Sequence, residues 1–156
     1  MAIVIVGLGN PGKEYEKTRH NAGRSAAELV AGDNEFDDFV FNKKANALVA
    51  NGAIEKENAT LVLPETMMNA SGKAVSAFIK SPKAAKNLLV IHDDLDLPLG
   101  TIKMVFARGS GGHKGVESWK PSEEAIFKKV LKKVAETVRL YASEGIESAT
   151  QFANTR

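Results

Sequence analysis

The chain has 156 residues, the size of one domain, and its apolar content of 44% is sufficient for a buried core. It contains no cysteine, which excludes disulfides, thiolate zinc sites and a cysteine nucleophile. The net charge of +2 is compatible with a polyanionic partner but does not require one.

The N-terminal run 2–6 is apolar and mostly β-branched, and it predicts a strand buried on both faces. The glycine-rich segment 7–12 that follows predicts a turn. The run is too short to span a membrane, and it lacks the basic leader and cleavage site of a signal peptide. We therefore expect a soluble, cytoplasmic protein.

Apolar residues at helical spacing predict a helix over 21–31, with Asn21 as its N-cap and Gly32 as the residue that ends it. Shorter strands are expected next, near 39–41, 45–50 and 60–63. Because aromatic residues make up only 6% of the chain, its core should consist mainly of Val, Ile, Leu and Ala.

The second half alternates helices and strands in the same way. The predicted elements are a helix over 66–79 ended by Ser81 and Pro82, a buried strand over 87–91, a strand over 101–106 and a long amphipathic helix capped by Ser122. The basic face of that last helix carries Lys128, Lys129, Lys132, Lys133 and Arg139. This alternation predicts an α/β fold: a single-domain three-layer sandwich, with a mixed, mainly parallel sheet and helices on both faces.

Polar, glycine-containing loops follow three of the predicted strands. They carry Asn10 with His20, then His92 with Asp93, Asp94 and Asp96, and finally His113 with Lys114. Open α/β sheets bind ligands at the carboxyl ends of their strands, so these loops predict a site. His20 is either a general base or a polar residue leading into a helix, and the acidic cluster either orients an imidazole, binds a cation or is a solvated turn.

Two other kinds of site are weighed against the same residues. The segment 7–12 matches the dinucleotide fingerprint GxGxxG, but Pro11 removes a backbone donor and 13–17 has no apolar face for the required helix. Three histidines and nearby acids would also suit a zinc hydrolase, although no HxH or HExxH spacing is present.

Five segments together resemble the bacterial-type peptidyl-tRNA hydrolase family in order and spacing. They are 5–12, then Tyr15 with 18–23, then 64–72, 92–100 and 109–113. The resemblance runs from Met1 to about Val116. It implies hydrolysis of the ester bond of N-acyl-aminoacyl-tRNA, releasing peptide and free tRNA for recycling. It further implies a cytoplasmic monomer that requires no metal, cofactor, membrane or obligate protein partner.

The resemblance also implies roles for individual residues. His20 corresponds to the general base that activates water, and Asp93 to the carboxylate that orients it. Asn10 and Asn69 correspond to the asparagines that hold the ester carbonyl, the peptide backbone or the water.

Further positions are candidates for contacts with the tRNA. Tyr15 and Met68 would line the cleft beside its 3′ CCA end. The candidates for binding phosphates are Lys103, Arg108, His113, Lys114 and the basic helix face.

The chain departs from the family pattern in two places. Lys114 stands where the family has asparagine, and around 116–121 the chain runs almost directly into its last helix, where the family continues through a helix, an arginine-rich strand and a loop. We expect one domain over 1–156 with an apparent deletion around 116–121. These departures favour the alternative of a non-catalytic RNA-binding member, whereas retention of the four residues assigned to the reaction favours an enzyme.

Overall fold

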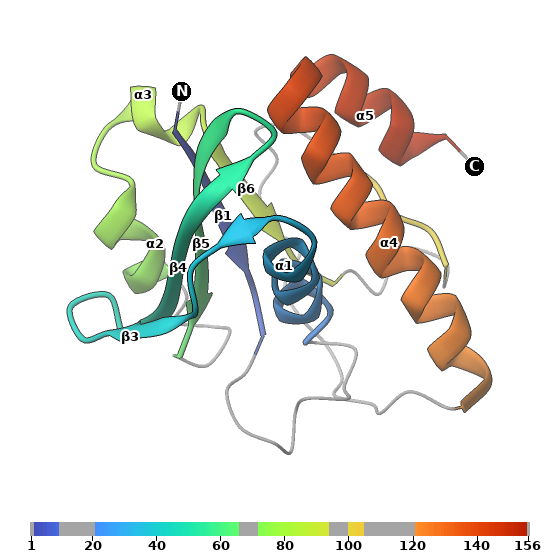
Figure 1. Ribbon diagram of the computed structural model, residues 1–156, viewed down its shortest axis with the longest axis horizontal. Coiled ribbons are helices and arrows are strands. Elements are labelled where there is room, and N and C mark those ends of the chain that lie inside the picture. The colour runs from blue at the N-terminus through green and yellow to red at the C-terminus, as the bar shows by residue number, and fades with distance from the viewer. Residues whose placement is uncertain (1, 10–20, 66–71, 94–99, 105–120, 156) are drawn as a thin grey trace.

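The computed structural model describes residues 2–9, 21–65, 72–93, 100–104 and 121–155, with only the backbone described for 121–124. These residues form an α/β sandwich in which helices cover both faces of a central sheet (Figure 1). In the described parts of the chain, no helix is long and apolar enough to cross a membrane.

The sheet of the described residues has six strands in the order β2-β4-β5-β1-β6, and β3 pairs with β4 beside β2. The strands are β1 (Ile3–Gly7), β2 (Glu35–Phe36), β3 (Val40–Asn42), β4 (Ala47–Ile54), β5 (Glu57–Pro64) and β6 (Leu88–Ile91). Parallel pairing joins β1 to both β5 and β6, and the pairs formed by β2, β3 and β5 with β4 are antiparallel. The predicted α/β class with a mixed sheet is confirmed. The sheet was expected to be mainly parallel, but among the described strands two pairs are parallel and three are antiparallel.

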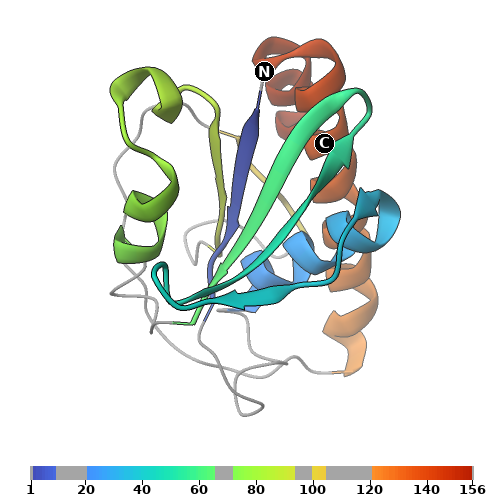
Figure 2. The ribbon, with the colours of Figure 1, turned by 60° about the vertical axis from the view of Figure 1, so that its left-hand side comes forward.

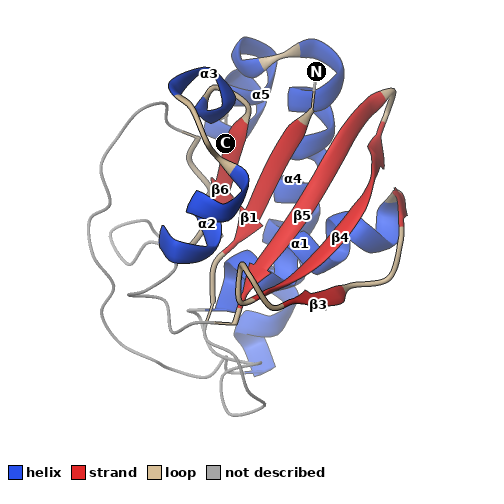
Figure 3. Ribbon diagram, turned by 90° about the vertical axis from the view of Figure 1, so that its left-hand side faces the viewer, coloured by secondary structure: helices blue, strands red, loops and turns tan. Residues whose placement is uncertain are grey.

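Helices form the outer two layers of the sandwich. One face is covered by α1 (Ala22–Asp33), α4 (Pro121–Glu144) and α5 (Ile146–Asn154), and the other by α2 (Gly72–Phe78) and α3 (Pro82–Ala85). Figures 2 and 3 show the sheet between these two groups. The predicted three-layer arrangement is therefore confirmed.

Strand alternation in β1 divides the core into two clusters. Ile3 and Ile5 pack toward α1, α4 and α5, whereas Val4 and Val6 belong to the cluster beside α2. Both faces of β1 are thus covered, as its continuous apolar run predicts. The buried core consists of Ile, Val, Leu and Ala with a single tyrosine among the described residues, as the low aromatic content indicates.

The boundaries of the first helix differ from those predicted. Asn21 precedes α1 as expected, but its side chain makes no capping hydrogen bond. Gly32 lies inside the helix instead of ending it. The helix ends at Asp33, and Asn34 is its C-cap. The Nδ2 atom of Asn34 donates to the carbonyl oxygen of Val30 at 2.8 Å, an acceptor that the last turn leaves free.

The second half of the chain also brings corrections. Ser81 and Pro82 do not only end a helix but begin α3, because the Ser81 hydroxyl accepts from the N–H of Ala84. Strand β6, the last in the order of the described strands, is only partly buried, with Val90 39% exposed. The long amphipathic helix is present as α4, but it begins at Pro121, so Ser122 lies inside the helix instead of capping it. A further helix, α5, follows after Gly145, whose φ of 96° interrupts the helical backbone.

A strand was predicted over 101–106. Residues 101–104, the part of this range that the structure describes, do not form a strand. The backbone of Met104 pairs there with a side chain: its N–H donates to Oδ1 of Asn154 at 2.8 Å, and its carbonyl oxygen accepts from Nδ2 of the same residue at 3.2 Å. An asparagine amide supplies the donor and the acceptor that a neighbouring strand would supply. The start of the predicted helix over 66–79 lies outside the described residues.

Two glycines allow α1 to approach the strands closely. A Cβ added at Gly23 would lie 2.1 Å from the carbonyl oxygen of Ile91 and 2.7 Å from the backbone of Leu8. A Cβ added at Gly7 would lie 2.5 Å from the carbonyl oxygen of Gly23. The N–H of Leu8 donates to Ile91, and the N–H of Arg24 donates to Leu8. The first turn of α1 therefore rests on the backbone at the ends of β1 and β6.

Replacing Gly23 should consequently destabilise the fold. Gly23→Ala places a methyl group against backbone atoms that cannot rotate away, so we expect the free energy of unfolding in urea to fall by about 1–3 kcal/mol. Gly32→Ala is the matched control, because Gly32 lies in the same helix and a Cβ there meets nothing within 4 Å. That control should gain up to about 1 kcal/mol from helix propensity. Equal stability of the two variants would contradict the close-packing argument.

Candidate active site at the carboxyl ends of β1 and β6

The candidate site lies where two neighbouring parallel strands end. Gly7 of β1 pairs in register with Ile91 of β6, so the chain leaves both strands at the same edge of the sheet. Asn10 comes three positions after Gly7, and Asp93 two positions after Ile91. Asn10 and His20 lie outside the described residues, but the segments on either side of them, 2–9 and 21–23, are described and meet β6 at this edge.

Asp93 is the predicted catalytic residue that the structure describes. The residue is partly buried, and its Oδ1 atom is shielded from solvent. The neighbouring His92 is exposed, and its Nδ1 lies 2.6 Å from the carbonyl oxygen of Asp93, so Nδ1–H donates to that oxygen. A shielded carboxylate oxygen argues against the solvated turn as the environment of Asp93. Asp94 and Asp96 lie outside the described residues.

The residue after His20 is held firmly in place. Asn21 is only 4% exposed, and a Cβ added at Gly9 would lie 2.6 Å from its Oδ1 atom. Gly9 and Asn21 are thus in direct contact, and each is the chain neighbour of a predicted site residue. The start of α1 and the end of β1 are fixed relative to each other at this point.

An ion pair beside these segments was not anticipated from the sequence. Arg24 of α1 donates from Nη1 to the carbonyl oxygen of Pro64 at 2.8 Å and from Nη2 to Oε1 of Glu65 at 3.1 Å. The side chains of Arg24 and Glu65 are only 12% and 24% exposed. A cation among the small apolar residues of α1 is the sequence signal that could have indicated a buried partner.

The predicted phosphate-binding residues are described only in part. Lys103 is exposed and adjoins Met104, whose backbone is held by Asn154. Arg108, His113 and Lys114 lie outside the described residues, as do Tyr15, Met68 and Asn69.

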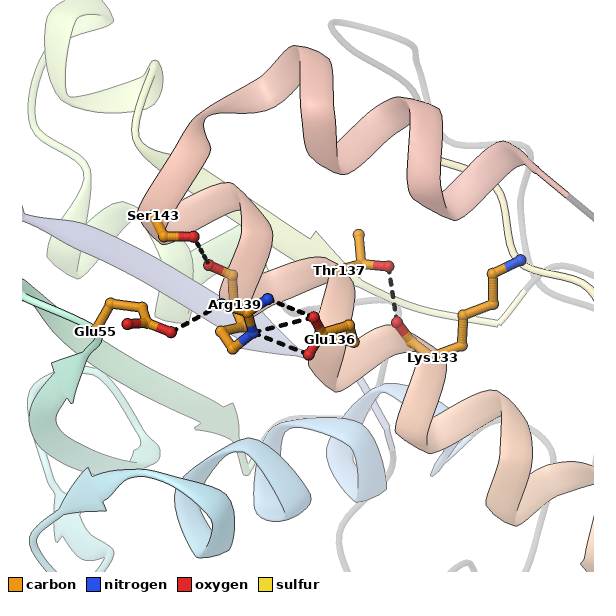
Figure 4. A network of polar contacts seen from close by, with 6 residues as sticks. All are labelled: Glu55, Lys133, Glu136, Thr137, Arg139 and Ser143. Atoms are coloured by element: carbon orange, nitrogen blue, oxygen red, sulfur yellow. Dashed lines mark hydrogen bonds and ion pairs between the residues drawn. The ribbon is translucent and has the colours of Figure 1, made fainter.

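Two of the five cations predicted on the basic face of α4, Lys133 and Arg139, have interaction partners in the structure. Lys133 donates to the carbonyl oxygen of Thr155 and lies 5.9 Å from the ring centre of Phe152. Arg139 pairs with Glu136 and Glu55 (Figure 4). These partners, Glu136 first, raise the pKa of Arg139 above its usual value, and the hydrogen bond from Arg139 lowers the pKa of Glu136.

The exposed cations that remain on this face are Lys128, Lys129 and Lys132. They lie in the first half of α4, which Figure 1 shows at the same end of the molecule as the carboxyl ends of β1 and β6. This part of the predicted basic face therefore belongs to the end of the molecule that holds the candidate site.

Cavities and metal-binding clusters among the described residues do not add a second candidate. One cavity of about 240 Å³ lies beside β3 and is lined by no predicted site residue. Another of about 260 Å³ lies between α1 and α4, and Lys132 and Arg139 of the predicted basic face are part of its lining. No group of three or more histidine, aspartate or glutamate side chains suited to a metal occurs within the described ranges. His20, His113, Asp94 and Asp96 are outside those ranges, so the zinc alternative stays untested.

The fold and the site define an open-sheet α/β protein with its polar loops at the carboxyl ends of parallel strands. Residues 4–121 match the sequence model of the family described as peptidyl-tRNA hydrolase. The chain therefore belongs to the peptidyl-tRNA hydrolase family.

Relatives support this assignment at different coverage. The chain is 50% identical over 117 residues to peptidyl-tRNA hydrolase of Methylacidiphilum infernorum, and the match covers 74% of this chain and 60% of that protein. It is 35% identical to the enzyme of Chloroflexus aggregans over 187 positions, covering 97% of this chain and 98% of that one. The chain thus spans about 60% of the Methylacidiphilum relative.

Solved structures agree with the fold. Peptidyl-tRNA hydrolase from Acinetobacter baumannii superposes with a TM-score of 0.88 at 27% identity, covering 99% of this chain and 95% of that one. The same values hold for a crystal structure of the complex of peptidyl-tRNA hydrolase with N-propanol.

The contact between α5 and the segment that carries Lys103 is open to a direct test. Asn154→Ala removes both hydrogen bonds to the Met104 backbone, so we expect the free energy of unfolding to fall by about 1–2 kcal/mol. Gln151→Ala, an exposed position in the same helix, should change it by less than about 0.5 kcal/mol. Urea unfolding monitored by circular dichroism measures both. Equal values for the two variants would show that Asn154 contributes no stability.

Proposed function

We propose that this protein hydrolyses the ester bond that joins a peptide to tRNA, releasing the peptide and free tRNA for recycling. Membership of the family supports the proposal, and one structural observation supports it further. Gly7 and Gly23 allow α1 to contact the ends of β1 and β6. This contact joins the segments that adjoin Asn10, His20 and Asp93 in the sequence.

The proposed chemistry needs a base, a positioned water molecule and hydrogen-bond donors. His20 accepts a proton from water as the water oxygen attacks the ester carbonyl, and Asp93 orients the imidazole and stabilises its charged form. Asn10 and Asn69 donate to the carbonyl oxygen as it becomes negative. The tetrahedral intermediate then expels the ribose oxygen of the tRNA, which takes up the proton held by His20 and restores the base. An alkoxide leaves far more readily than an amine, so no covalent nucleophile, metal or cofactor is required.

Specificity for a peptide follows from the chemistry of asparagine. Its amide pairs with both the N–H and the C=O of a peptide backbone without contacting side chains. A free aminoacyl-tRNA presents a charged amine at the same place, and desolvating that amine opposes binding. The proposed site therefore distinguishes an acylated from a free amino group.

The proposed tRNA surface combines the loops of the site with the first half of α4. Tyr15 and Met68 would line the cleft for the 3′ CCA end, and Lys103 and Arg108 would contact phosphates of the acceptor stem. His113 and Lys114 would contribute from the segment that precedes α4 in the sequence, with the ammonium group of Lys114 as a partner for a phosphate. The exposed Lys128, Lys129 and Lys132 extend this surface.

We propose that the chain is one domain over 1–156 with a shortened connection around 116–121. The family match ends at residue 121, where α4 begins. The alignment with the Chloroflexus relative spans 187 positions although this chain has 156 residues, so part of that relative has no counterpart here. We further propose that the protein acts as a cytoplasmic monomer without an obligate protein partner.

Release of peptide from N-acetyl-aminoacyl-tRNA tests the reaction. His20→Ala removes the base and should lower kcat by about 10²- to 10⁴-fold. Asp93→Asn removes the charge of the carboxylate that orients the base and should also lower kcat. Asp33→Asn, at the exposed end of α1, is the matched control for the second variant and should retain the wild-type rate. EDTA should leave the wild-type rate unchanged.

Other outcomes would select an alternative. Activity that survives His20→Ala contradicts the mechanism, and inhibition by EDTA favours a metal-dependent hydrolase. A wild-type protein that binds the tRNA but releases no peptide is the non-catalytic RNA-binding member of the family.

The contribution of Lys103 to tRNA binding is measured separately. Lys103→Gln removes one exposed cation, so we expect KM to rise about two- to fivefold with little change in kcat. The slope of log KM against log salt should decrease in magnitude by about 1, the value for one phosphate contact. Lys86→Gln is the control, because Lys86 is an exposed lysine at the amino end of β6, away from the site. The same KM in both variants would remove Lys103 from the surface.

A further inference from the structure

Arg24 joins the first turns of α1 to the end of β5. Its side chain is only 12% exposed, and an arginine is rarely this buried without partners. Its guanidinium donates to the carbonyl oxygen of Pro64 at 2.8 Å and to Oε1 of Glu65 at 3.1 Å. The two acceptors lie 40 and 41 positions away in the sequence, so these hydrogen bonds fix two distant segments to each other.

The same residue also holds the end of β1. A Cβ added at Gly9 would lie 2.8 Å from Cδ and 2.9 Å from Cγ of Arg24, so the aliphatic stem of the arginine rests directly on the Gly9 backbone. The N–H of Arg24 donates to the carbonyl oxygen of Leu8 at 3.2 Å. Arg24 therefore contacts the ends of β1 and β5 and belongs to the helix that follows His20.

Each of these three segments lies next to a residue of the proposed mechanism in the sequence. Gly9 directly precedes Asn10, Arg24 follows His20 by four positions, and Glu65 precedes Asn69 by four. We propose that Arg24, paired with Glu65, is a positioning residue that sets the places of these three side chains relative to one another. The inference rests on the proposed function for what the three side chains do.

The geometry of Glu65 suits this role. Its backbone N–H donates to the carbonyl oxygen of Asn46 at 2.9 Å while its carboxylate accepts from Arg24, so the residue is held from two sides. The pair is largely shielded from water, and salt screens such a pair less than an exposed one. A misplacement of about 1 Å in a catalytic group costs about 10²-fold in rate, so a rigid link at this point affects the reaction.

The opposite end of the same hairpin supplies a matched control. Glu55, between β4 and β5, forms an ion pair of 3.0 Å with Arg139 of α4 (Figure 4). Both of these side chains are 41% exposed, and the pair lies at the amino end of β5, away from the candidate site. Glu55→Gln and Glu65→Gln are therefore the same chemical change at the two ends of one strand.

Steady-state kinetics with N-acetyl-aminoacyl-tRNA test the proposal on protein shown to be folded by circular dichroism. Arg24→Met keeps the stem and removes the guanidinium, and we expect kcat/KM to fall by about tenfold or more, with KM raised, because the substrate-holding groups lose their alignment. Arg24→Lys should recover part of this loss. Glu65→Gln should raise KM in the same direction, whereas Glu55→Gln should leave kcat and KM at wild-type values.

A purely structural role for Arg24 predicts a different result. It would lower the folded fraction, so the apparent kcat would fall in proportion while KM stayed unchanged, and that outcome overturns the proposal. Wild-type kinetics in folded Arg24→Met overturns it as well. If Arg24→Met does not fold, the double variant Arg24→Met/Glu65→Gln, which leaves no unpaired carboxylate, is measured in its place.

Amide hydrogen exchange separates this inference from the proposed function. Peptides covering residues 65–72 should exchange faster in Arg24→Met than in wild type, and at the wild-type rate in Glu55→Gln. Unchanged exchange in Arg24→Met would overturn the link between α1 and the end of β5. A wild-type protein that releases no peptide would refute the proposed function, and the exchange result would still decide whether Arg24 fixes this segment.

Discussion

The contact between the first turn of α1 and the backbone of β1 and β6 is the constraint on which the rest of the structure depends. Gly7 and Gly23 face each other there, and neither position has room for a Cβ atom. The missing side chains let a helix rest on the backbone of two strands at the edge where α/β sheets bind ligands. A larger residue at either position would move α1, and with it the segment that leads out of the predicted catalytic base.

The proposed base and its carboxylate lie more than seventy positions apart in the sequence, and this constraint joins the elements next to them. Asp93 follows β6 by two residues, and α1 begins two residues after His20, so the supports of both side chains are regular elements in direct contact. Arg24 extends the same support to the end of β5 through its guanidinium. A reaction that uses only water, a base and hydrogen-bond donors depends almost entirely on such placement.

Local pattern predicted more of this protein than long-range contact did. The segments that form β1 and β5 are apolar runs that can be recognised within one short stretch of sequence. The resemblance in five short segments likewise identified the family from the sequence. The two-residue strand β2, the division of the last helix at Gly145 and the pairing of Met104 with Asn154 were not predicted. The strand and the pairing depend on partners elsewhere in the chain, and the Gly145 break lies inside a continuous amphipathic pattern. The residues of the proposed site were predicted from the sequence. The ion pair of Arg24 with Glu65 was not, because it too depends on a partner far away in the chain.

The C-terminal helices are part of the core whether or not the connection before them is shortened, as we propose. Val138 and Tyr141 of α4 and Ala149 of α5 belong to the same buried cluster as Ile3 and Ile5 of β1, so these helices are part of the core. The amide of Asn154 in α5 takes the place of a neighbouring strand for Met104. The elements that support the proposed base and its carboxylate, α1, β1 and β6, lie wholly before residue 100. If the corresponding connection carries phosphate-binding side chains in longer relatives, the proposed shortening should weaken tRNA binding and raise KM. It should leave kcat unchanged, because α1, β1 and β6 align the base and its carboxylate.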